Sequence, residues 1–325
     1  MRRTTLFLGL VAGSTLTGVP AIAGTADTYP TRAIRMIVPF PPGGLSDGLA
    51  RIIGQQLAHE WGQQIVVDNR PGASTILAAE LVAKSPADGY TLFFQDITTQ
   101  GINAGLYRKL PYHSVDDFVA VAMASASPLI LSVHPSLPAK SVKELIALAR
   151  ARPGQINYGS SGSGAILHLA GETFKKLAGI DLVHVPYKGS PPAVTATLAG
   201  EVAIVFATTA SVLPHVKSGR IRALAVTTAL RSPLLPDLPP IADTLPGYDI
   251  ILYQGILAPA KTPRDIVVRL NAEINKLLAK PATKESWDRF GAEIIILTPE
   301  EMNTRFQREV AKLSKLALES GARID

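Results

Sequence analysis

The sequence contains no cysteine, and this absence excludes several kinds of chemistry at once. Without cysteine the chain forms no disulfide, no thiolate metal site and no thiol nucleophile, and it carries no lipid anchor attached through cysteine. Aromatic residues are also scarce, at 6%, and no run of Lys or Arg is long enough to follow a phosphate backbone. A nucleic-acid partner is therefore not expected.

Hydrophobic runs long enough to cross a membrane are missing as well. The nearest candidate, Leu6–Ala12, follows the basic Arg2 and Arg3 and is far shorter than the roughly 20 apolar residues of a spanning helix. Small residues then lead to Ala21–Ala23, which has the form that signal peptidase cleaves. We predict a signal peptide over residues 1–23 and an exported mature protein, with an uncleaved anchor as the less favoured alternative.

The size of the remaining chain predicts more than one folding unit. About 300 residues exceed what a single hydrophobic core usually serves, so two lobes are expected. Without the two N-terminal arginines the net charge of +6 falls to roughly +4, which is spread along the chain and suits weak attraction of an anion.

Short apolar runs alternate with helical patterns, which predicts right-handed βαβ units and doubly wound α/β sheets. Most of the runs are continuous in Val, Ile and Leu, as is typical of strands buried on both faces of a parallel sheet. The predicted strands are Ile34–Phe40, Gln64–Asp68, Thr91–Gln95, Leu129–His134, Asn157–Gly159, Leu182–Pro186, Val202–Ala207, Ala223–Thr227, Gly255–Ala258 and Glu293–Leu297.

Helix starts are indicated by capping patterns. Ser141 and Glu144 form a capping box, in which each side chain satisfies a backbone N–H group of the first turn. Thr298 and Glu301 have the same spacing and open the last helix. Pro263 is expected at the first helical position of another helix, where its missing N–H costs nothing.

Ligands of open α/β sheets bind where strands end and helices begin, so these junctions are the candidate site. The first junction runs from Pro39 to Asp47, and Phe40, Gly43, Gly44, Leu45 and Ser46 lie on it. Its glycines allow a tight turn, and the N–H groups of the next helical turn point at the ligand. Asp47 either caps this helix or contacts a ligand hydroxyl or water; a carboxylate facing an anionic ligand would repel it, which favours the cap.

The second junction, Tyr158–Gly164, supplies Ser160, Ser161 and Ser163 between glycines at a helix start. Backbone and hydroxyl donors together make an anion cradle there, and a merely capped turn is the weaker interpretation. His168 lies one turn further on, where a structural role is the simpler interpretation.

Three further junctions are rich in hydroxyl groups or glycine. They add the ligand-binding candidates Thr98 and Thr99 after the third strand, Tyr187 before Lys188, and Ala207, Thr208 and Thr209. Known phosphate-loop, hydrolase and zinc-site patterns are missing, so neither a metal nor a catalytic residue is predicted. Polar junctions with few fixed charges favour binding over catalysis, although distant residues of a cleft hydrolase could still converge in the fold.

At these junctions the sequence resembles the Bug, or tripartite tricarboxylate transporter, family of periplasmic substrate-binding proteins. The motifs follow one another in order along nearly the whole mature chain. They are Tyr29–Asp47, Asp68–Gly72, Asp88–Leu92, Leu137–Leu145, His184–Gly189, Leu213–Lys217 and Leu257–Ala260.

The resemblance implies a two-lobed α/β fold, the type II fold of periplasmic binding proteins, with a doubly wound sheet in each lobe and a hinge crossed twice. By this analogy lobe one comprises residues 27–127 and 252–325, and lobe two comprises residues 128–251. The resemblance also implies capture of a small carboxylate by residues 43–47, aided by ordered water, and by residues 160–163 opposite. It implies membrane permease subunits as partners, and we expect a monomer without a cofactor.

Three segments depart from the family pattern and are expected to line the pocket. They are Gln95–Ile97, Ala207–Thr209 and Tyr253–Gln254, where relatives carry other residues; Tyr253 is therefore a candidate ligand contact. Without an acidic group at position 207, an α-amino acid is less favoured than a dicarboxylate or an aromatic carboxylate. A sensing role with a signalling partner is the alternative to transport.

Overall fold

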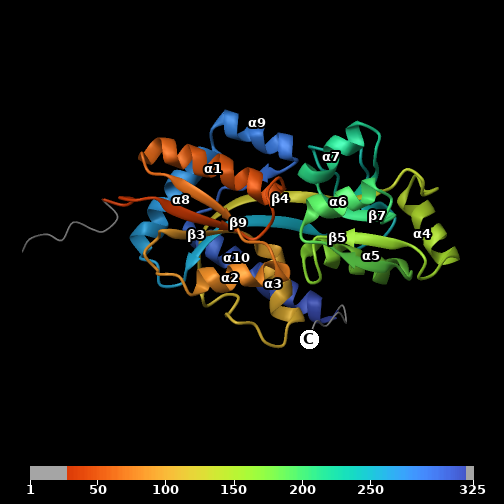
Figure 1. Cartoon of the computed structure of the whole chain (residues 1–325), viewed down its shortest axis with the longest axis horizontal. Helices are drawn as coiled ribbons and strands as arrows, with labels where there is room; N and C mark the ends of the chain where they lie inside the picture. Colours follow the sequence, from red (N-terminus) through yellow and green to blue (C-terminus); the bar gives the residue numbers. More distant parts are fainter. Residues whose placement is uncertain (1–27, 320–325) are drawn as a thin grey trace, which may run out of the picture.

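A computed structural model describes residues 28–319 of the chain. The predicted signal peptide lies outside these residues. Figure 1 shows two lobes side by side, joined by two long strands that run through both. The described strands form one mixed sheet of ten, in the order β2-β1-β3-β9-β4-β7-β5-β6, with β10 and β8 each paired to β4. No helix in this range is both long and apolar enough to cross a membrane.

Lobe one, on the left of Figure 1, has parallel strands and helices on both faces of its part of the sheet. β3 pairs on its other side with β9, which runs antiparallel to it. The elements are β1 (Ile34–Val38), α1 (Leu45–Trp61), β2 (Ile65–Asn69), a 3₁₀ turn (Ala73–Thr75), α2 (Ile76–Ala83), β3 (Thr91–Asp96), α3 (Ile97–Leu106), α8 (Arg264–Leu278), α9 (Pro281–Phe290), β10 (Glu293–Ile294) and α10 (Pro299–Glu319).

Lobe two, on the right, repeats this arrangement with β5 parallel to both β6 and β7. Its elements are α4 (Val142–Ala151), β5 (Asn157–Ser160), α5 (Ile166–Ala178), β6 (Val183–Pro186), α6 (Ser190–Leu198), β7 (Ile204–Thr208), α7 (Thr209–Lys217), β8 (Arg222–Val226) and a 3₁₀ turn (Ile241–Asp243). The α/β fold and the doubly wound character of both lobes are thus confirmed.

The two lobes share β4 (Phe118–Val133) and β9 (Ile251–Pro259). These strands pair antiparallel from Phe118 opposite Pro259 to Pro128 opposite Ile251, and β4 then continues beside β7 and β8 in lobe two. The chain therefore crosses between lobes within paired strands, with two register shifts in the β4–β9 ladder.

The sequence predicted only the second half of β4. Its first half is composed largely of Ala and Ser, which have low strand propensity and therefore do not stand out as a strand. The structure gives the reason for small residues: Ala120–Ala124 is almost fully buried. Asn271 of α8 and Trp287 of α9 donate hydrogen bonds to the carbonyl oxygens of Val121 and Ala124, at 2.7 Å and 3.0 Å.

Both predicted N-cap bonds are present, but only the Thr298 box is complete, because Glu144 accepts the N–H of Lys140 at 2.7 Å and not that of Ser141. Ser141 Oγ accepts the N–H of Glu144 at 3.2 Å, and Thr298 Oγ1 accepts the N–H of Glu301 at the same distance. The prediction for Pro263 was wrong by one position, because α8 begins at Arg264 and Pro263 is its N-cap. The strand predicted to end at Leu297 is also shorter, since β10 comprises only two residues.

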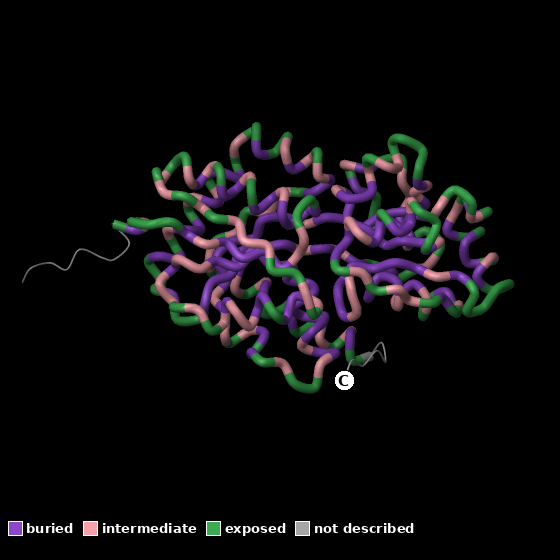
Figure 2. The backbone as a smooth tube through the Cα atoms, viewed as in Figure 1, coloured by how far each residue is buried: buried purple, intermediate pink, exposed green. Residues whose placement is uncertain are grey.

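Buried residues follow the central strands through both lobes, as Figure 2 shows. The largest hydrophobic cluster includes Met36 and Trp287 from lobe one and Phe174 and Phe206 from lobe two. Two smaller clusters cover the opposite faces of the two sheet regions. This packing fixes the ends of the strands, and the candidate site lies where those ends meet.

Candidate functional site

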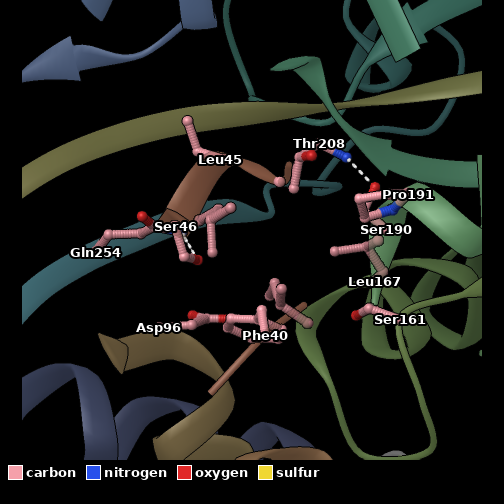
Figure 3. Close-up of a pocket in the computed structure, with 13 residues that line it drawn as sticks. Phe40, Leu45, Ser46, Asp96, Ser161, Leu167, Ser190, Pro191, Thr208 and Gln254 are labelled. Carbon is pink, nitrogen blue, oxygen red and sulfur yellow. Dashed lines mark hydrogen bonds between the residues drawn. The ribbon is translucent and has the colours of Figure 1, made fainter. Parts of the chain in front are cut away.

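A cavity of about 370 Å³, called here the first cavity, lies between the two lobes and is shown in Figure 3. Residues that follow β1, the last residue of β3 and two residues of β9 line one side, and residues that follow β5 and β6 and the last residue of β7 line the other. The strands of both lobes thus direct their carboxyl ends at one gap, as expected for this class of sheet. The lining residues are Phe40, Gly44, Leu45, Ser46, Asp96, Ser161, Ile166, Leu167, Ser190, Pro191, Thr208, Leu252 and Gln254.

The start of α1 presents free backbone donors to this cavity. Its N-cap, Gly44, has no side chain to cap the helix, and the N–H groups of Leu45 and Ser46 have no acceptor among the described residues. Unsatisfied N–H groups and the positive end of the helix dipole together favour a negatively charged ligand. The arrangement of this junction therefore matches the predicted anion-binding role.

Asp47 supports this helix start from outside the cavity. Its carboxylate accepts the N–H of Gly43 at 3.0 Å and hydrogen bonds from Arg51 and Asn69, also at 3.0 Å. Burial opposes the charged form, but the bonds from Arg51, Gly43 and Asn69 outweigh it and lower the pKa of Asp47. Asp47 occupies the third helical position and reaches back to Gly43, so it stabilises the turn without being the N-cap itself.

Ser46 connects α1 to the hinge strand. Its hydroxyl oxygen accepts a 2.7 Å hydrogen bond from Gln254 Nε2 of β9, the bond drawn at the left of Figure 3. Because the oxygen is the acceptor in this bond, the hydroxyl hydrogen of Ser46 remains able to donate to a ligand.

The serine loop after β5 has two serines with different roles. Ser160 is fully buried, and its hydroxyl lies 2.6 Å from His184 Nε2, where it holds the loop in place. The hydroxyl of Ser161 is buried and has no hydrogen-bond partner, although it lines the first cavity. An unpartnered buried hydroxyl is costly unless something else satisfies it, so Ser161 is the better candidate for ligand contact.

The imidazole rings behind this loop are structural. His168 and His184 stack with their centroids 4.0 Å apart, and His168 Nδ1 accepts the N–H of Gly164 at 3.1 Å. Burial, with a smaller contribution from His168, lowers the pKa of His184 to about 4. Both rings are therefore neutral near pH 7, in agreement with the structural interpretation of His168.

Hydrogen bonds join the lobes beside the cavity. Thr99 Oγ1, on α3 of lobe one, accepts the N–H of Ile166 at the start of α5, at 3.1 Å. Ser74 donates a hydrogen bond to the carbonyl oxygen of Ser163. A Cβ placed on Gly189 would lie only 2.9 Å from Pro41, so the loops of the two lobes also pack closely. The structure is therefore closed around the first cavity.

The charge of the first cavity is carried by one group. Asp96 is its sole ionisable lining residue in the described part of the chain. Burial raises the pKa of Asp96 to about 6, against the opposing effect of hydrogen bonds from Thr99 and Thr98. Over residues 28–319 no group of three or more His, Asp or Glu side chains is arranged to hold a metal ion.

The structure distributes the sequence-predicted residues over several positions. Six line the first cavity: Phe40, Gly44, Leu45, Ser46, Ser161 and Thr208. Ser163 and Tyr187 line a second cavity of about 610 Å³, which shares Phe40 and Ser161 with the first. Thr98 and Tyr253 line a third cavity, of about 370 Å³, beside α10. The remaining six line none of these three cavities, and all of them except the exposed Gly43 are buried: Gly43, Asp47, Thr99, Ser160, Ala207 and Thr209.

Seven lining residues were not among the predicted contacts. Ile166, Leu167 and Leu252 look like core residues in the sequence, and only the closed fold places them at the cavity. Ser190 and Pro191 belong to the same junction as Tyr187, three and four residues further along the chain, so the junction was found but these two residues were not chosen as ligand contacts. Asp96 and Gln254 belong to the segments that depart from the family pattern. That departure is the sequence feature that could have identified them as lining residues.

Two lobes closing on a cavity lined by helix starts define a binding protein of the periplasmic type, and similar solved structures share this fold. A Rhodopseudomonas palustris protein, Rpa4515, solved with adipate, is 38% identical with a TM-score of 0.87 over 90% of this chain and 98% of that one. MatC of the same organism, with bound malate, is 28% identical with a TM-score of 0.84 over 89% of this chain and 100% of that one.

The sequence comparisons agree with the structural ones. The protein BugT of Bordetella pertussis is 37% identical over 302 residues, which cover 92% of this chain and 93% of BugT. Residues 49–321 match the family described as the tripartite tricarboxylate transporter family receptor. The chain belongs to this receptor family, which confirms the resemblance.

Proposed function

We propose that this protein captures a small carboxylate in the first cavity and delivers it to the permease subunits of a tripartite tricarboxylate-type transporter in the periplasm. The observation that carries the proposal is the pairing of free N–H groups at the start of α1 with the unpartnered Ser161 hydroxyl across one gap. Related proteins with bound adipate and malate support the ligand class.

The residues that line the first cavity indicate how the ligand is recognised. Six lining residues are apolar, and no Lys or Arg is among the lining residues that the structure describes. Recognition of the carboxylate by backbone amides and hydroxyls, with an apolar wall for the carbon chain, is therefore the proposed mode. The proposal is binding without turnover: the hydroxyl of Ser160 lies 2.6 Å from His184 Nε2, but neither residue lines the first cavity.

The proposal includes the earlier domain boundaries and a monomeric state. Pro128 of β4 lies opposite Ile251 of β9, and this pair lies beside the proposed boundaries at residues 127/128 and 251/252. Lobe closure excludes water from the cavity, which strengthens the polar contacts with the ligand. The contact of Thr99 with Ile166 then belongs to the closed, ligand-holding form.

Thermal unfolding with a panel of carboxylates tests the proposal. A ligand that binds only the folded state adds about 2.7 kcal/mol at a concentration of 100 times its Kd, which raises Tm. The panel contains adipate, malate, a tricarboxylate and benzoate, and native mass spectrometry identifies protein that already carries a ligand. If ligand-free protein shows no Tm shift with any of them, the proposal is wrong.

Two neighbouring serines provide a matched pair of variants. Ser161→Ala removes a hydroxyl without a partner, so we expect an unchanged Tm of the free protein and weaker binding by roughly 10- to 150-fold, the range for a hydrogen bond to a charged group. Ser160→Ala removes the bond to His184, so we expect it to lower the Tm of the free protein. Equal affinity of Ser161→Ala and wild type would contradict the assigned role of Ser161.

A further inference from the structure

A buried carboxylate faces a cavity that is expected to hold an anion. Asp96 ends β3, is 1% exposed, and lines the first cavity below Ser46 in the view of Figure 3. A second negative charge beside a carboxylate ligand is unfavourable in a site of low dielectric, unless a cation or a proton compensates it. The capture of one carboxylate therefore does not explain why a carboxylate side chain is buried at this position.

The hydrogen bonds of Asp96 leave capacity on one oxygen. Oδ1 accepts the N–H groups of Thr98 and Thr99 at 2.9 Å and 3.0 Å, which caps α3. Oδ2 accepts the hydroxyl of Thr99, whose oxygen in turn accepts the N–H of Ile166. Because an ionised carboxylate oxygen takes two hydrogen bonds, Oδ2 can accept one more donor from a ligand.

Within residues 28–319, no Lys or Arg lines the first cavity to compensate the charge of Asp96. The titratable groups on the packed elements have other partners or face other surfaces: Asp47 binds Arg51, His168 lies beside Glu172, and Tyr253 lies under Arg305. None of the following lines the first cavity: Asp47 and Arg51 of α1, Tyr253 of β9, His168, Glu172 and Lys175 of α5, and Arg305, Arg308, Glu309 and Lys312 of α10.

We propose that Asp96 determines ligand specificity: it accepts a hydrogen bond from a hydroxyl or amino group of the ligand, and it admits a second carboxylate at that end only together with a proton. The inference rests on the proposed function, since it concerns the end of the ligand opposite the carboxylate held by α1. The preferred ligand class is then a carboxylate with a hydroxyl or amino group at its far end.

The acid–base behaviour of Asp96 supports the second half of this inference. Burial already raises its pKa to about 6 without a ligand, and a neighbouring carboxylate would raise it further. A diacid therefore binds with uptake of one proton at neutral pH, and its affinity falls about tenfold for each pH unit between the pKa of free Asp96, about 6, and the higher pKa of the complex. A hydroxy acid keeps the same affinity over this range.

Isothermal titration calorimetry with two probes of equal length tests the inference. Adipate and 6-hydroxyhexanoate differ only in a carboxylate replaced by a hydroxymethyl group. Between pH 7 and pH 8 we expect wild type to lose about tenfold in affinity for adipate, with close to one proton taken up, and to bind 6-hydroxyhexanoate unchanged. Measurements in two buffers of different ionisation enthalpy give the number of protons.

The variant Asp96→Asn removes the charge and retains a residue that caps helices well. We expect it to bind adipate without proton uptake, more tightly than wild type at pH 8, and to lose tenfold or more in its preference for 6-hydroxyhexanoate. Asp68→Asn, which removes a carboxylate paired with Arg35 and Arg70 outside the cavity, is the charge-matched control and is expected to retain the wild-type ratio.

The outcomes separate this inference from the proposed function. Binding of adipate without proton uptake, or an unchanged ratio of the two affinities in Asp96→Asn, would overturn the role of Asp96 alone. Failure of both probes, together with failure of the whole carboxylate panel to raise Tm, would overturn the proposed function and the inference with it.

Discussion

Replacement of Thr99 by Val is the most direct test of the closed form. The hydroxyl of Thr99 accepts the N–H of Ile166 from the opposite lobe, and both groups are buried at the gap. Valine has nearly the same shape, so the change keeps the packing and removes two hydrogen bonds, the one from Ile166 across the gap and the one to Asp96 within lobe one. In the closed form the N–H of Ile166 is then buried without a partner, which costs about 1–3 kcal/mol.

When the lobes separate, water can form a hydrogen bond with the N–H group of Ile166. The variant therefore destabilises only the closed form, and this cost weakens ligand binding. A penalty of that size on the closed form raises Kd roughly 5- to 150-fold. Calorimetric titration with whichever panel carboxylate binds wild type measures it. We also expect a lower Tm of the free protein, since Thr99 donates a hydrogen bond to Asp96 within lobe one.

Thr197→Val supplies the control for loss of a buried hydroxyl. Thr197 is fully buried on α6 and bonds only the carbonyl oxygen of Ala193, within its own helix. Its variant is expected to lower Tm and leave Kd unchanged. The reasoning about closure is refuted if Thr99→Val binds the ligand within twofold of wild type.

Three further changes test other parts of the structure. Trp287→Phe leaves the buried carbonyl of Ala124 unpaired, so we expect a loss of about 1–3 kcal/mol, seen as a lower urea midpoint with an unchanged m-value. Gly189→Ala forces a side chain into φ +123° and against Pro41, so we expect weaker ligand binding by calorimetry. For His184, whose folded pKa is lowered to about 4, the unfolded chain takes up the proton first, so its contribution to stability is present above about pH 6.5 and is lost as the pH falls towards 4.

Matched variants make the last two tests specific. Gly200→Ala also has a positive φ, at +76°, but open space around the added methyl group, so it reports backbone strain without the inter-lobe contact. His184→Gln removes the titrating ring, and the stability advantage of wild type over this variant is expected to shrink on acidification in urea melts. An advantage that is constant from pH 7 to pH 4 would contradict the lowered pKa.

Local sequence patterns predicted those features that depend on a few adjacent residues. The glycine pair before α1 and the serines after β5 were recognisable because helix starts with small and hydroxyl-bearing residues have a known chemistry. The N-caps at Ser141 and Thr298 are equally local, and the structure contains both of these hydrogen bonds. The apolar runs in the sequence predict where the strands before these junctions end.

Features that depend on contacts between distant segments were not predictable in the same way. Leu167 and Leu252 line the cavity only because two lobes meet there, and neither has a sequence signal that separates it from the core. The first half of β4 was missed because its small residues are selected by the helices packed over them, not by strand propensity. The distinction between Ser160 and Ser161 likewise depends on His184, which lies on another strand.

The continuous pairing of β4 with β9 limits how the lobes can move. Thr227 adds a further tie at the crossing, because its hydroxyl donates to the carbonyl oxygen of Ile250 at 2.8 Å and accepts the N–H of Leu129 at 2.9 Å. A connection of this kind twists and bends as an elastic ribbon, whereas a loop would allow the lobes to slide or to exchange partners. We therefore expect the gap to open by a rotation of limited amplitude about the β4–β9 crossing, which would return the two rims to the same alignment on each reclosure.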